Sequence, residues 1–410
     1  MPAPASGRGA IAALAGAFLT QFAAGFGFIT FSLLAPSLAV LTGLNERDFG
    51  LWVTFFFFGT AVSSPATGLL VRRFGGVWTV ALALFAMAAA MLVNLGGSWA
   101  ITMLAATLYG LAYGPQGPVG MTVVTERTPP SRRGFFLALR HSSQPLAGII
   151  AGRLLPPLML VVGWQFGIFT TVGVLVAAAL FTLTTPALFR VTTVPVAPPS
   201  YGRRGISWAA GSVVRALAVP VGLRLLWGAG LVFAVNQIAM IVFSYLYLLE
   251  VAKLTPIEAG IFLSNMQIAG LLGRPALGWF CDKTGQSQLV LALLSAIGVA
   301  TIFALMSVSG AGMPLWQLFI LAIACGLSGQ TWNAIFTTAM SYKVPPERLA
   351  ELNGRSFAFL SLGWMAGAPF FWLLIEVSGG YAAPFIVVGA ANALAAIALI
   401  VSAWRERARA

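Results

Sequence analysis

The stretch that decides the fold reads GLLGRPALGWFCDKTGQ and covers residues 270–286. It places Arg274 inside an apolar run, eight residues before the charged pair Asp282–Lys283. Its later part, extended to GRPALGWFCDKTGQSQLV (273–290), has the same layout as SSPATGLLVRRFGGVWTV (63–80). In both stretches an apolar run closes with a glycine, a charged pair and a turn that contains glycine. The chain therefore repeats one structural plan in its two halves.

A second pair of matching stretches supports the repeat. YGLAYGP and VVTERTPPSRRG in the first half match CGLSGQT and AMSYKVPPERLA in the second, with Pro-Pro pairs at 129–130 and 345–346. The segment between the halves is rich in proline, serine and arginine, which is typical of a linker. We predict an N-terminal bundle at 1–189, a cytoplasmic linker at 190–218 and a C-terminal bundle at 219–410.

The composition indicates a membrane protein. Hydrophobic residues make up 59% of the 410 residues and charged residues only 8%, whereas soluble proteins have about 25% charged residues. A membrane-spanning helix needs about 20 apolar residues, and about twelve runs approach or exceed that length. They cover 10–34, 48–70, 77–95, 99–125, 134–160, 164–189, 219–249, 256–280, 287–309, 314–342, 350–376 and 381–403. We predict an all-α integral membrane protein whose twelve transmembrane helices form two pseudo-symmetric six-helix bundles.

The net charge of +13 reflects membrane orientation. Basic residues follow the even-numbered runs and the last run, while the opposite loops carry few. This bias marks the cytoplasmic side. We therefore predict a multi-pass protein of the cell inner (plasma) membrane with both termini in the cytoplasm. The lipid bilayer is the expected partner, and nucleic acid is excluded.

Six plus six helices with a long central loop resemble the major facilitator superfamily. The segment GWFCDKTG matches that family's loop signature through Gly278, Asp282, Lys283 and Gly285. The first half keeps Gly68, Arg72, Arg73 and Gly75 but lacks the aspartate. The resemblance implies a substrate site near the bilayer midplane between the halves, alternating access, and a gating role for these eight residues. The alternative is that the charged residues only cap helices in water.

A narrower resemblance concerns Arg274. GRPALGWFCDKTG is similar to the eighth-helix segment of the oxalate/formate antiporters and monocarboxylate porters, in which the arginine contacts a carboxylate substrate. The resemblance implies that role for Arg274. Oxalate carriers add a lysine in the eleventh helix, where this chain has FAFLSLGW (357–364) and no cation. The similarity therefore concerns the branch and not one substrate.

Elementary electrostatics also favours an anion. An arginine at the centre of a membrane helix costs about 2.5–3.5 kcal/mol on insertion scales, and such residues usually face a water-filled cavity. Arg140 lies inside the fifth run and is followed in the sequence by His141 and Gln144. The ten acidic residues of the chain lie at predicted helix ends, in loops or in the tail, so none is placed to pair with either arginine inside the membrane. A bound carboxylate would relieve both arginines because guanidinium binds it through two hydrogen bonds. The alternative is that backbone carbonyls, amides and water satisfy them.

Further polar residues fall on helices that line the cavity in this fold. With the residues above they complete the predicted substrate site: Gln21, Tyr113, Gln116, Asn236, Gln237, Asn265, Gln267, Gln330 and Asn333. The alternative for each is a hydrogen bond between helices.

We expect a secondary transporter of a small organic anion, such as a monocarboxylate, working by proton symport or by anion exchange (antiport). His141 or the substrate's own carboxyl group could carry the proton. The alternative function is an exporter of drugs or neutral solutes. The sequence has no enzyme motif, so we expect no catalytic residue, metal or cofactor. The resemblance implies a monomer, which is the usual state of this fold.

Overall fold

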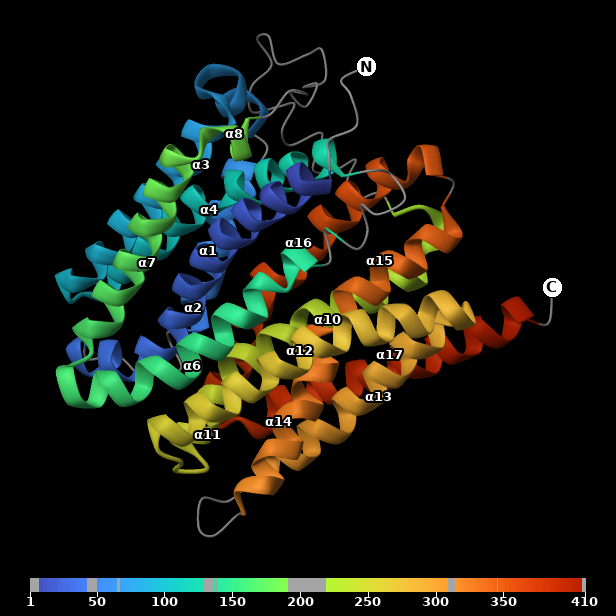
Figure 1. The fold of residues 1–410 in the computed structure, drawn as a ribbon. Coiled ribbons are helices and arrows are strands. Elements are labelled where there is room, and N and C mark those ends of the chain that lie inside the picture. The colour runs from blue at the N-terminus through green and yellow to red at the C-terminus, as the bar shows by residue number, and fades with distance from the viewer. Residues whose placement is uncertain are drawn as a thin grey trace. The chain divides into compact units, whose positions relative to one another are not determined.

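The computed structural model describes residues 7–42, 50–64, 67–128, 136, 139–190, 219–308, 314–344 and 346–407 (Figure 1). Within these ranges the regular structure is helical and no residue lies in a strand, which confirms the predicted all-α class. The chain divides into two compact units, Met1–Arg204 and Gly205–Ala410. Residues 191–218, nearly all of the predicted linker, lie outside the described part.

The N-terminal unit is a bundle of long helices. Its elements are α1 (Gly7–Thr42), α2 (Gly50–Ser63), α3 (Thr67–Val93), η3 (Asn94–Gly96), α4 (Trp99–Arg127), α6 (Ser143–Val162), α7 (Gln165–Thr184) and α8 (Pro186–Phe189). The loop expected between the second and third runs is instead helical as far as Phe74. The chain bends at Gly75, whose φ of 76° and ψ of 165° suit glycine and strain other residues.

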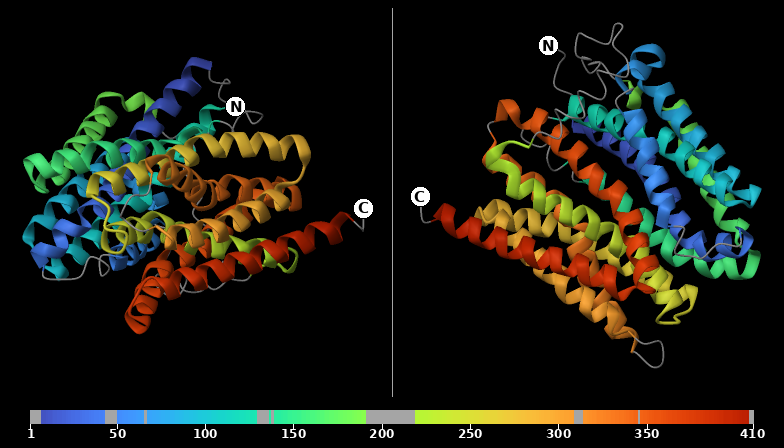
Figure 2. Two further views of the ribbon diagram at one scale, coloured as in Figure 1. Left: turned by 90° about the horizontal axis from the view of Figure 1, so that it is seen from below. Right: turned by 180° about the vertical axis from the view of Figure 1, so that it is seen from behind.

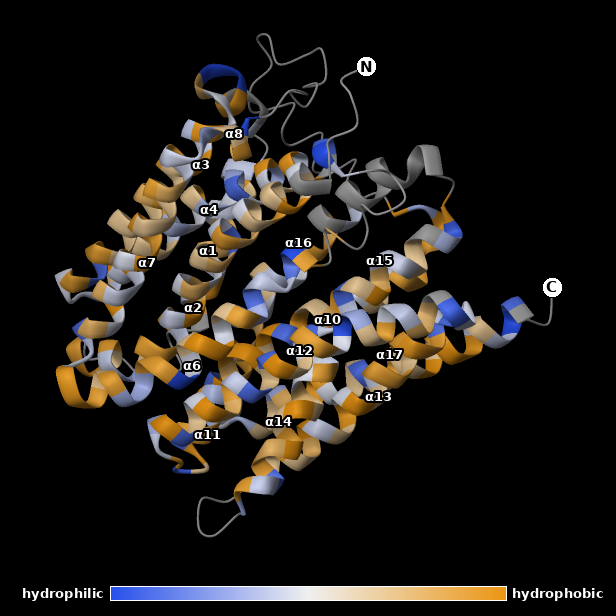
Figure 3. Ribbon diagram, in the orientation of Figure 1, coloured by the Kyte–Doolittle hydropathy of each residue, from blue (hydrophilic) through white to orange (hydrophobic). Residues whose placement is uncertain are grey.

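The C-terminal unit repeats this plan with more interruptions. Its elements are η5 (Val221–Leu223), α10 (Arg224–Ile238), the π-helix η6 (Ala239–Phe243), α11 (Ser244–Glu250), α12 (Pro256–Thr284), α13 (Ser287–Met306), α14 (Leu315–Gln330), α15 (Trp332–Lys343), α16 (Pro346–Ser378) and α17 (Ala382–Arg407). Within each unit the helices run largely alongside one another (Figure 2). Hydrophobic residues occupy most of their length (Figure 3).

Nine of the described helical segments are long and apolar enough to cross a membrane. The three other predicted runs are also helical, but each falls short of that standard. Residues 51–63 of α2 form a shorter apolar helix. The helices α4 and α12 are long but carry polar side chains, among them Gln116 and Arg274. Both helices contribute side chains to the candidate site described below.

Local sequence signals fix both ends of α12. At its start, the Thr255 hydroxyl accepts from the Glu258 amide, while the Glu258 carboxylate accepts from the Thr255 amide at 2.9 Å. This reciprocal cap satisfies amide groups that a helix start leaves without partners. At its end, Gly285 adopts a left-handed conformation with φ of 67° and donates to the Cys281 carbonyl at 2.8 Å. Between these ends α12 carries Arg274 within an otherwise apolar run.

Glycines at matching places in the two units bring pairs of helices into backbone contact. A Cβ atom on Gly110 of α4 would overlap the carbonyl oxygen of Phe56 on α2. A Cβ atom on Gly326 of α14 would likewise overlap the carbonyl oxygen of Met266 on α12. Gly110 and Gly326 hold the same place in the matching stretches YGLAYGP and CGLSGQT. The sequence repeat is thus also a repeat of close helix packing.

The tenth predicted run, 314–342, is not one continuous helix. It is divided into α14 and α15 at Thr331, whose hydroxyl donates to the Leu327 carbonyl at 2.5 Å. A threonine side chain that bonds back in this way bends helices. The break leaves the Gln330 carbonyl available to a neighbouring helix, and Arg274 uses it.

Candidate functional site

Four polar residues join in the N-terminal unit, and we call them the N-terminal polar cluster: Gln21, Tyr113, Arg140 and Gln144. Arg140 lies in the helical turn before α6 and is completely buried. Its Nη2 atom donates to Gln21 Oε1 at 2.7 Å. The Tyr113 hydroxyl accepts from the Gln21 amide at 3.1 Å and from the Gln144 amide at 2.6 Å. Helices α1, α4 and α6 thus converge on Tyr113.

Two predicted site residues of this unit lie apart from those contacts. Gln116 donates to the Thr20 hydroxyl at 3.2 Å, and its buried Oε1 atom has no hydrogen-bond partner. His141 follows Arg140 in the chain, but its side chain is exposed. The sequence did not indicate Thr20, because a threonine within a helix usually bonds to its own backbone.

A second group, the C-terminal polar cluster, consists of Gln237, Arg274, Gln330 and Trp364. The Arg274 side chain is buried, with 8% exposure, and its Nε atom donates to the Gln330 carbonyl at 3.0 Å. Gln237 donates to Gln330 Oε1 at 3.2 Å and accepts from the Trp364 indole at 2.9 Å. Gln330 Nε2 is buried without a hydrogen-bond partner. Four helices, α10, α12, α14 and α16, contribute to this cluster.

The other predicted residues of the C-terminal unit are Asn236, Asn265, Gln267 and Asn333. Asn236 accepts from Asn392 at 3.3 Å, and Ser295 donates to the Asn392 carbonyl at 3.0 Å. Asn265 and Gln267 are buried on α12, and Asn333 is half-buried on α15. Sequence reasoning missed Trp364, Ser295 and Asn392. A tryptophan and an asparagine within apolar runs were the available signals.

The Arg274 contact has a counterpart in the first half. Ser64 precedes Pro65 as Arg274 precedes Pro275 in the matching stretches. The Ser64 hydroxyl lies 2.7 Å from the carbonyl oxygen of Thr60, one turn earlier, and 3.3 Å from that of Gly114, so its one hydrogen is shared between them. Gly114 holds the place in the repeat that Gln330 holds in the second half. A neutral serine therefore takes the place of the arginine in the first half and reaches the corresponding carbonyl through the longer of its two contacts. The positive charge of Arg274 is not needed for that contact.

The eight predicted gating residues lie around two glycine turns. Gly75 and Gly285 both have positive φ, at 76° and 67°. Arg72, Arg73 and Lys283 are exposed. Lys283 Nζ lies 5.1 Å from the Trp279 ring centroid. Gly68 and Gly278 lie within α3 and α12, and the Asp282 side chain lies outside the described part. The gating role stays a prediction.

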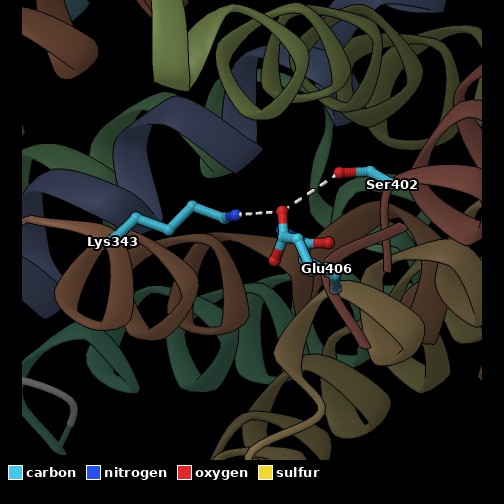
Figure 4. Close-up of polar contacts among 4 residues, drawn as sticks. Lys343, Ser402 and Glu406 are labelled. Carbon is cyan, nitrogen blue, oxygen red and sulfur yellow. Dashed lines mark hydrogen bonds and ion pairs between the residues drawn. The ribbon is translucent and has the colours of Figure 1, made fainter. Parts of the chain in front are cut away.

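Basic residues that precede the Pro-Pro pairs tie helix ends together in both units. In the N-terminal unit, Arg127 donates to the carbonyls of Ala187 at 2.8 Å and Arg190 at 2.9 Å. In the C-terminal unit, Lys343 pairs with Glu406 at 2.6 Å, and Ser402 donates to the same carboxylate at 3.2 Å (Figure 4). Both contacts hold the end of a helix whose last carbonyls lack partners within the helix.

We expect the Lys343–Glu406 pair to contribute little to stability. The two side chains are 22% and 53% exposed, and ion pairs at such positions contribute about 0.2–1 kcal/mol. A double-mutant cycle with Lys343→Ala and Glu406→Ala, read as unfolding free energies in detergent, should give a coupling energy in this range. Purely additive effects of the two substitutions would show that the pair does not link α15 to α17.

Comparisons with known proteins support this architecture. The protein named "Uncharacterized MFS-type transporter Rv2994" from Mycobacterium tuberculosis is 27% identical over 354 residues, covering 85% of this chain and 75% of that protein. "Probable sulfoacetate transporter SauU" from Cupriavidus necator is 24% identical over 407 residues, covering 93% and 90%. The crystal structure of the peptide transporter POT in complex with sulfate has a TM-score of 0.73, at 15% identity, covering 96% of this chain and 94% of that one. At this identity the likeness shows the fold alone.

A family model adds the decisive match. The Major Facilitator Superfamily model matches residues 17–348, which is most of the chain. The repeat, the helical bundles and the buried polar clusters are all consistent with this match. The chain therefore belongs to the Major Facilitator Superfamily.

Proposed function

We propose that this multi-pass membrane transporter moves a small organic anion, a carboxylate, by alternating access. The observation that carries the proposal is the burial of Arg274 inside α12. The matching position in the first half holds the neutral Ser64, whose hydroxyl lies 3.3 Å from the corresponding carbonyl oxygen, so the repeated helix packing does not by itself require an arginine. A buried cation is expensive in a membrane and is usually retained for a function.

Three considerations favour a carboxylate as the substrate. A guanidinium group matches a carboxylate geometrically through two parallel hydrogen bonds. Gln330, whose backbone carbonyl accepts from Arg274, has a buried side-chain amide nitrogen without a hydrogen-bond partner, and this nitrogen can donate to an oxygen of the substrate. A relative that covers nearly the whole chain is named as a transporter of sulfoacetate, which is itself an organic anion.

The proposal assigns substrate contact to both polar clusters and to the remaining predicted polar residues. It assigns gating to the two signature loops, with both termini and the linker in the cytoplasm and the protein in the plasma membrane as a monomer. Either proton symport or anion exchange can drive the cycle. In the first case the exposed His141 or the substrate's own carboxyl group carries the proton; exchange needs no protein group to titrate.

A transport assay on purified protein tests this function. Reconstituted protein is assayed for counterflow of radiolabelled acetate, lactate, malonate and succinate, with glucose and tetraphenylphosphonium as neutral and cationic probes. We expect saturable uptake of at least one carboxylate, competed by unlabelled carboxylates. Faster transport of either non-anionic probe than of every carboxylate would instead support an exporter of drugs or neutral solutes.

A further inference from the structure

We infer that Arg153 lines a water-filled part of the transport pathway, on the side of α6 that faces away from the N-terminal polar cluster, and draws anions into it. The inference rests on the proposed function only for the kind of solute that uses the pathway. Contact with water and preference for negative charge can both be measured without any substrate. Sequence reasoning singled out Arg140 in this part of the chain and passed over Arg153.

The first argument is the depth of Arg153 in its span. The segment Leu139–Val162 is long and apolar enough to cross a membrane, and Arg153 lies fourteen residues from its start and nine from its end. Among the charged residues of the nine such spans in the described part, Arg153 is the one that lies more than four residues from both ends. The nearer end is about 14 Å away along the helix, a distance that an arginine side chain does not bridge. A cation at such a depth usually faces a water-filled cavity.

The second argument is the direction in which Arg153 points. It follows Gln144 by nine residues, which is about two and a half helical turns, so the two side chains leave opposite sides of α6. Gln144 bonds to Tyr113 in the N-terminal polar cluster, whereas Arg153 is exposed. Arg153 therefore points out of the N-terminal unit, where lipid would leave its charge unsolvated and water would not.

The third argument is the backbone that follows Arg153. Pro156 and Pro157 lie inside α6. Proline has no amide hydrogen, so these residues cannot donate the usual helical bonds to the carbonyls of Gly152 and Arg153. Interrupted backbone of this kind is tolerated in a membrane where it is buried in protein or lines a water-filled cavity. Gly152 is buried but Arg153 is exposed, so the exposed side of α6 favours water over lipid.

The helix α7, which packs against α6, provides a contrast. It carries no charged residue between Gln165 and Thr184. Its exposed residues Phe169, Gly173 and Ala177 follow one another at helical spacing, and none of them is polar. A side of this kind suits lipid. The two helices meet near Gly163, so residues equally far from Gly163 lie at about the same depth.

Cysteine reactivity on the reconstituted full chain tests the inference. The natural cysteines Cys281 and Cys325 are both buried, so an added thiol can be followed above a low background. Ile150→Cys lies three residues before Arg153 and is its neighbour on the helix surface. Ala177→Cys is the matched control, because Ile150 and Ala177 lie thirteen and fourteen residues from Gly163 and both are exposed.

The probes are two membrane-impermeant methanethiosulfonates, the anionic sulfonatoethyl and the cationic trimethylammonioethyl reagent. Both react with the thiolate, whose formation an apolar environment suppresses. We expect Ile150→Cys to react at least about tenfold faster than Ala177→Cys. Because Ile150→Cys keeps the native arginine, this comparison does not depend on a variant at position 153.

The charge of Arg153 should also set which reagent reacts faster. In the Ile150→Cys chain, adding Arg153→Gln should lower the ratio of anionic to cationic labelling rates about 3- to 10-fold, as expected for one charge acting across a turn of helix in water. Arg153→Lys should keep the ratio, because only the charge is needed. The effect of Arg153→Gln should shrink between about 0.01 M and 1 M salt, where the Debye length falls from about 30 Å to about 3 Å.

Equally slow labelling of Ile150→Cys and Ala177→Cys would place this side of α6 against lipid and overturn the inference. A ratio of rates unaffected by Arg153→Gln would overturn the attraction of anions. Failure of the proposed function is a different result. It would be seen as a chain that keeps fast, charge-dependent labelling at Ile150→Cys yet carries no carboxylate in counterflow.

Discussion

Replacing Arg274 with serine should abolish most carboxylate transport while leaving the fold intact. Serine already occupies the matching position in the first half, where the Ser64 hydroxyl lies 3.3 Å from the Gly114 carbonyl oxygen. The loss of two charge-assisted hydrogen bonds to substrate predicts a fall of about 100-fold or more in transport efficiency, measured as Vmax/KM for counterflow. The Arg274→Lys variant should show an intermediate fall in transport efficiency of about tenfold, because lysine keeps the positive charge but lacks the planar guanidinium that forms two parallel hydrogen bonds.

The matched control for these variants is Arg224→Lys. Arg224 lies in the same unit, at the start of α10, and is exposed. Its transport should equal that of the wild type. If Arg274→Ser transported carboxylates at the wild-type rate, the guanidinium would have no part in recognition, and the proposed function would lose the observation that carries it.

Alanine at Gly110 or at Gly326 should be the most destabilising small change in its unit. A Cβ atom at either position would overlap a backbone carbonyl oxygen, that of Phe56 or that of Met266. A backbone cannot rotate away as a side chain can, so the helices must separate. Overpacked cores lose about 1–3 kcal/mol and occasionally more, and we expect about 3 kcal/mol here because backbone is displaced. Unfolding free energies measured in detergent test this expectation.

Two glycines without close neighbours provide the controls. A Cβ atom on Gly173 of α7 or on Gly228 of α10 would meet no atom within 4 Å. Alanine at these sites should be neutral or stabilising by up to about 1 kcal/mol, because alanine favours the helix. A Gly326→Ala variant as stable as Gly228→Ala would show that α12 and α14 do not touch through their backbones.

Much of this fold could be predicted from the sequence, because a membrane demands long apolar helices. The all-α class, the repeat and the family all follow from the apolar runs and from the matching stretches around Gly68 and Gly278. The helix breaks could not be predicted, because hydropathy does not distinguish a helix from a broken helix. Thr331 and the π-helix at Ala239–Phe243 depend on which backbone groups find partners in neighbouring helices.

The sequence could predict which residues belong to the candidate site, but it could predict less well which of them bond to one another. Arg140 and Arg274 stood out because charge is rare in such runs, and the structure buries both. Which amides join them depends on helix rotation, which the sequence does not reveal. The Tyr113 hydroxyl accepts hydrogen bonds from two side-chain amides, whereas the Gln116 amide, one turn away on the same helix, donates to the Thr20 hydroxyl.

The pair Ser64 and Arg274 bears on how such a chain evolves after gene duplication. Both residues precede a proline and approach corresponding carbonyls, so the position belongs to the plan that the two halves share. The charge is present in only one copy. In a chain built of two similar halves, one half can thus change its substrate specificity while the other half keeps the shared helix packing. Ancestral reconstruction of this position would date the acquisition of the charge relative to the fusion.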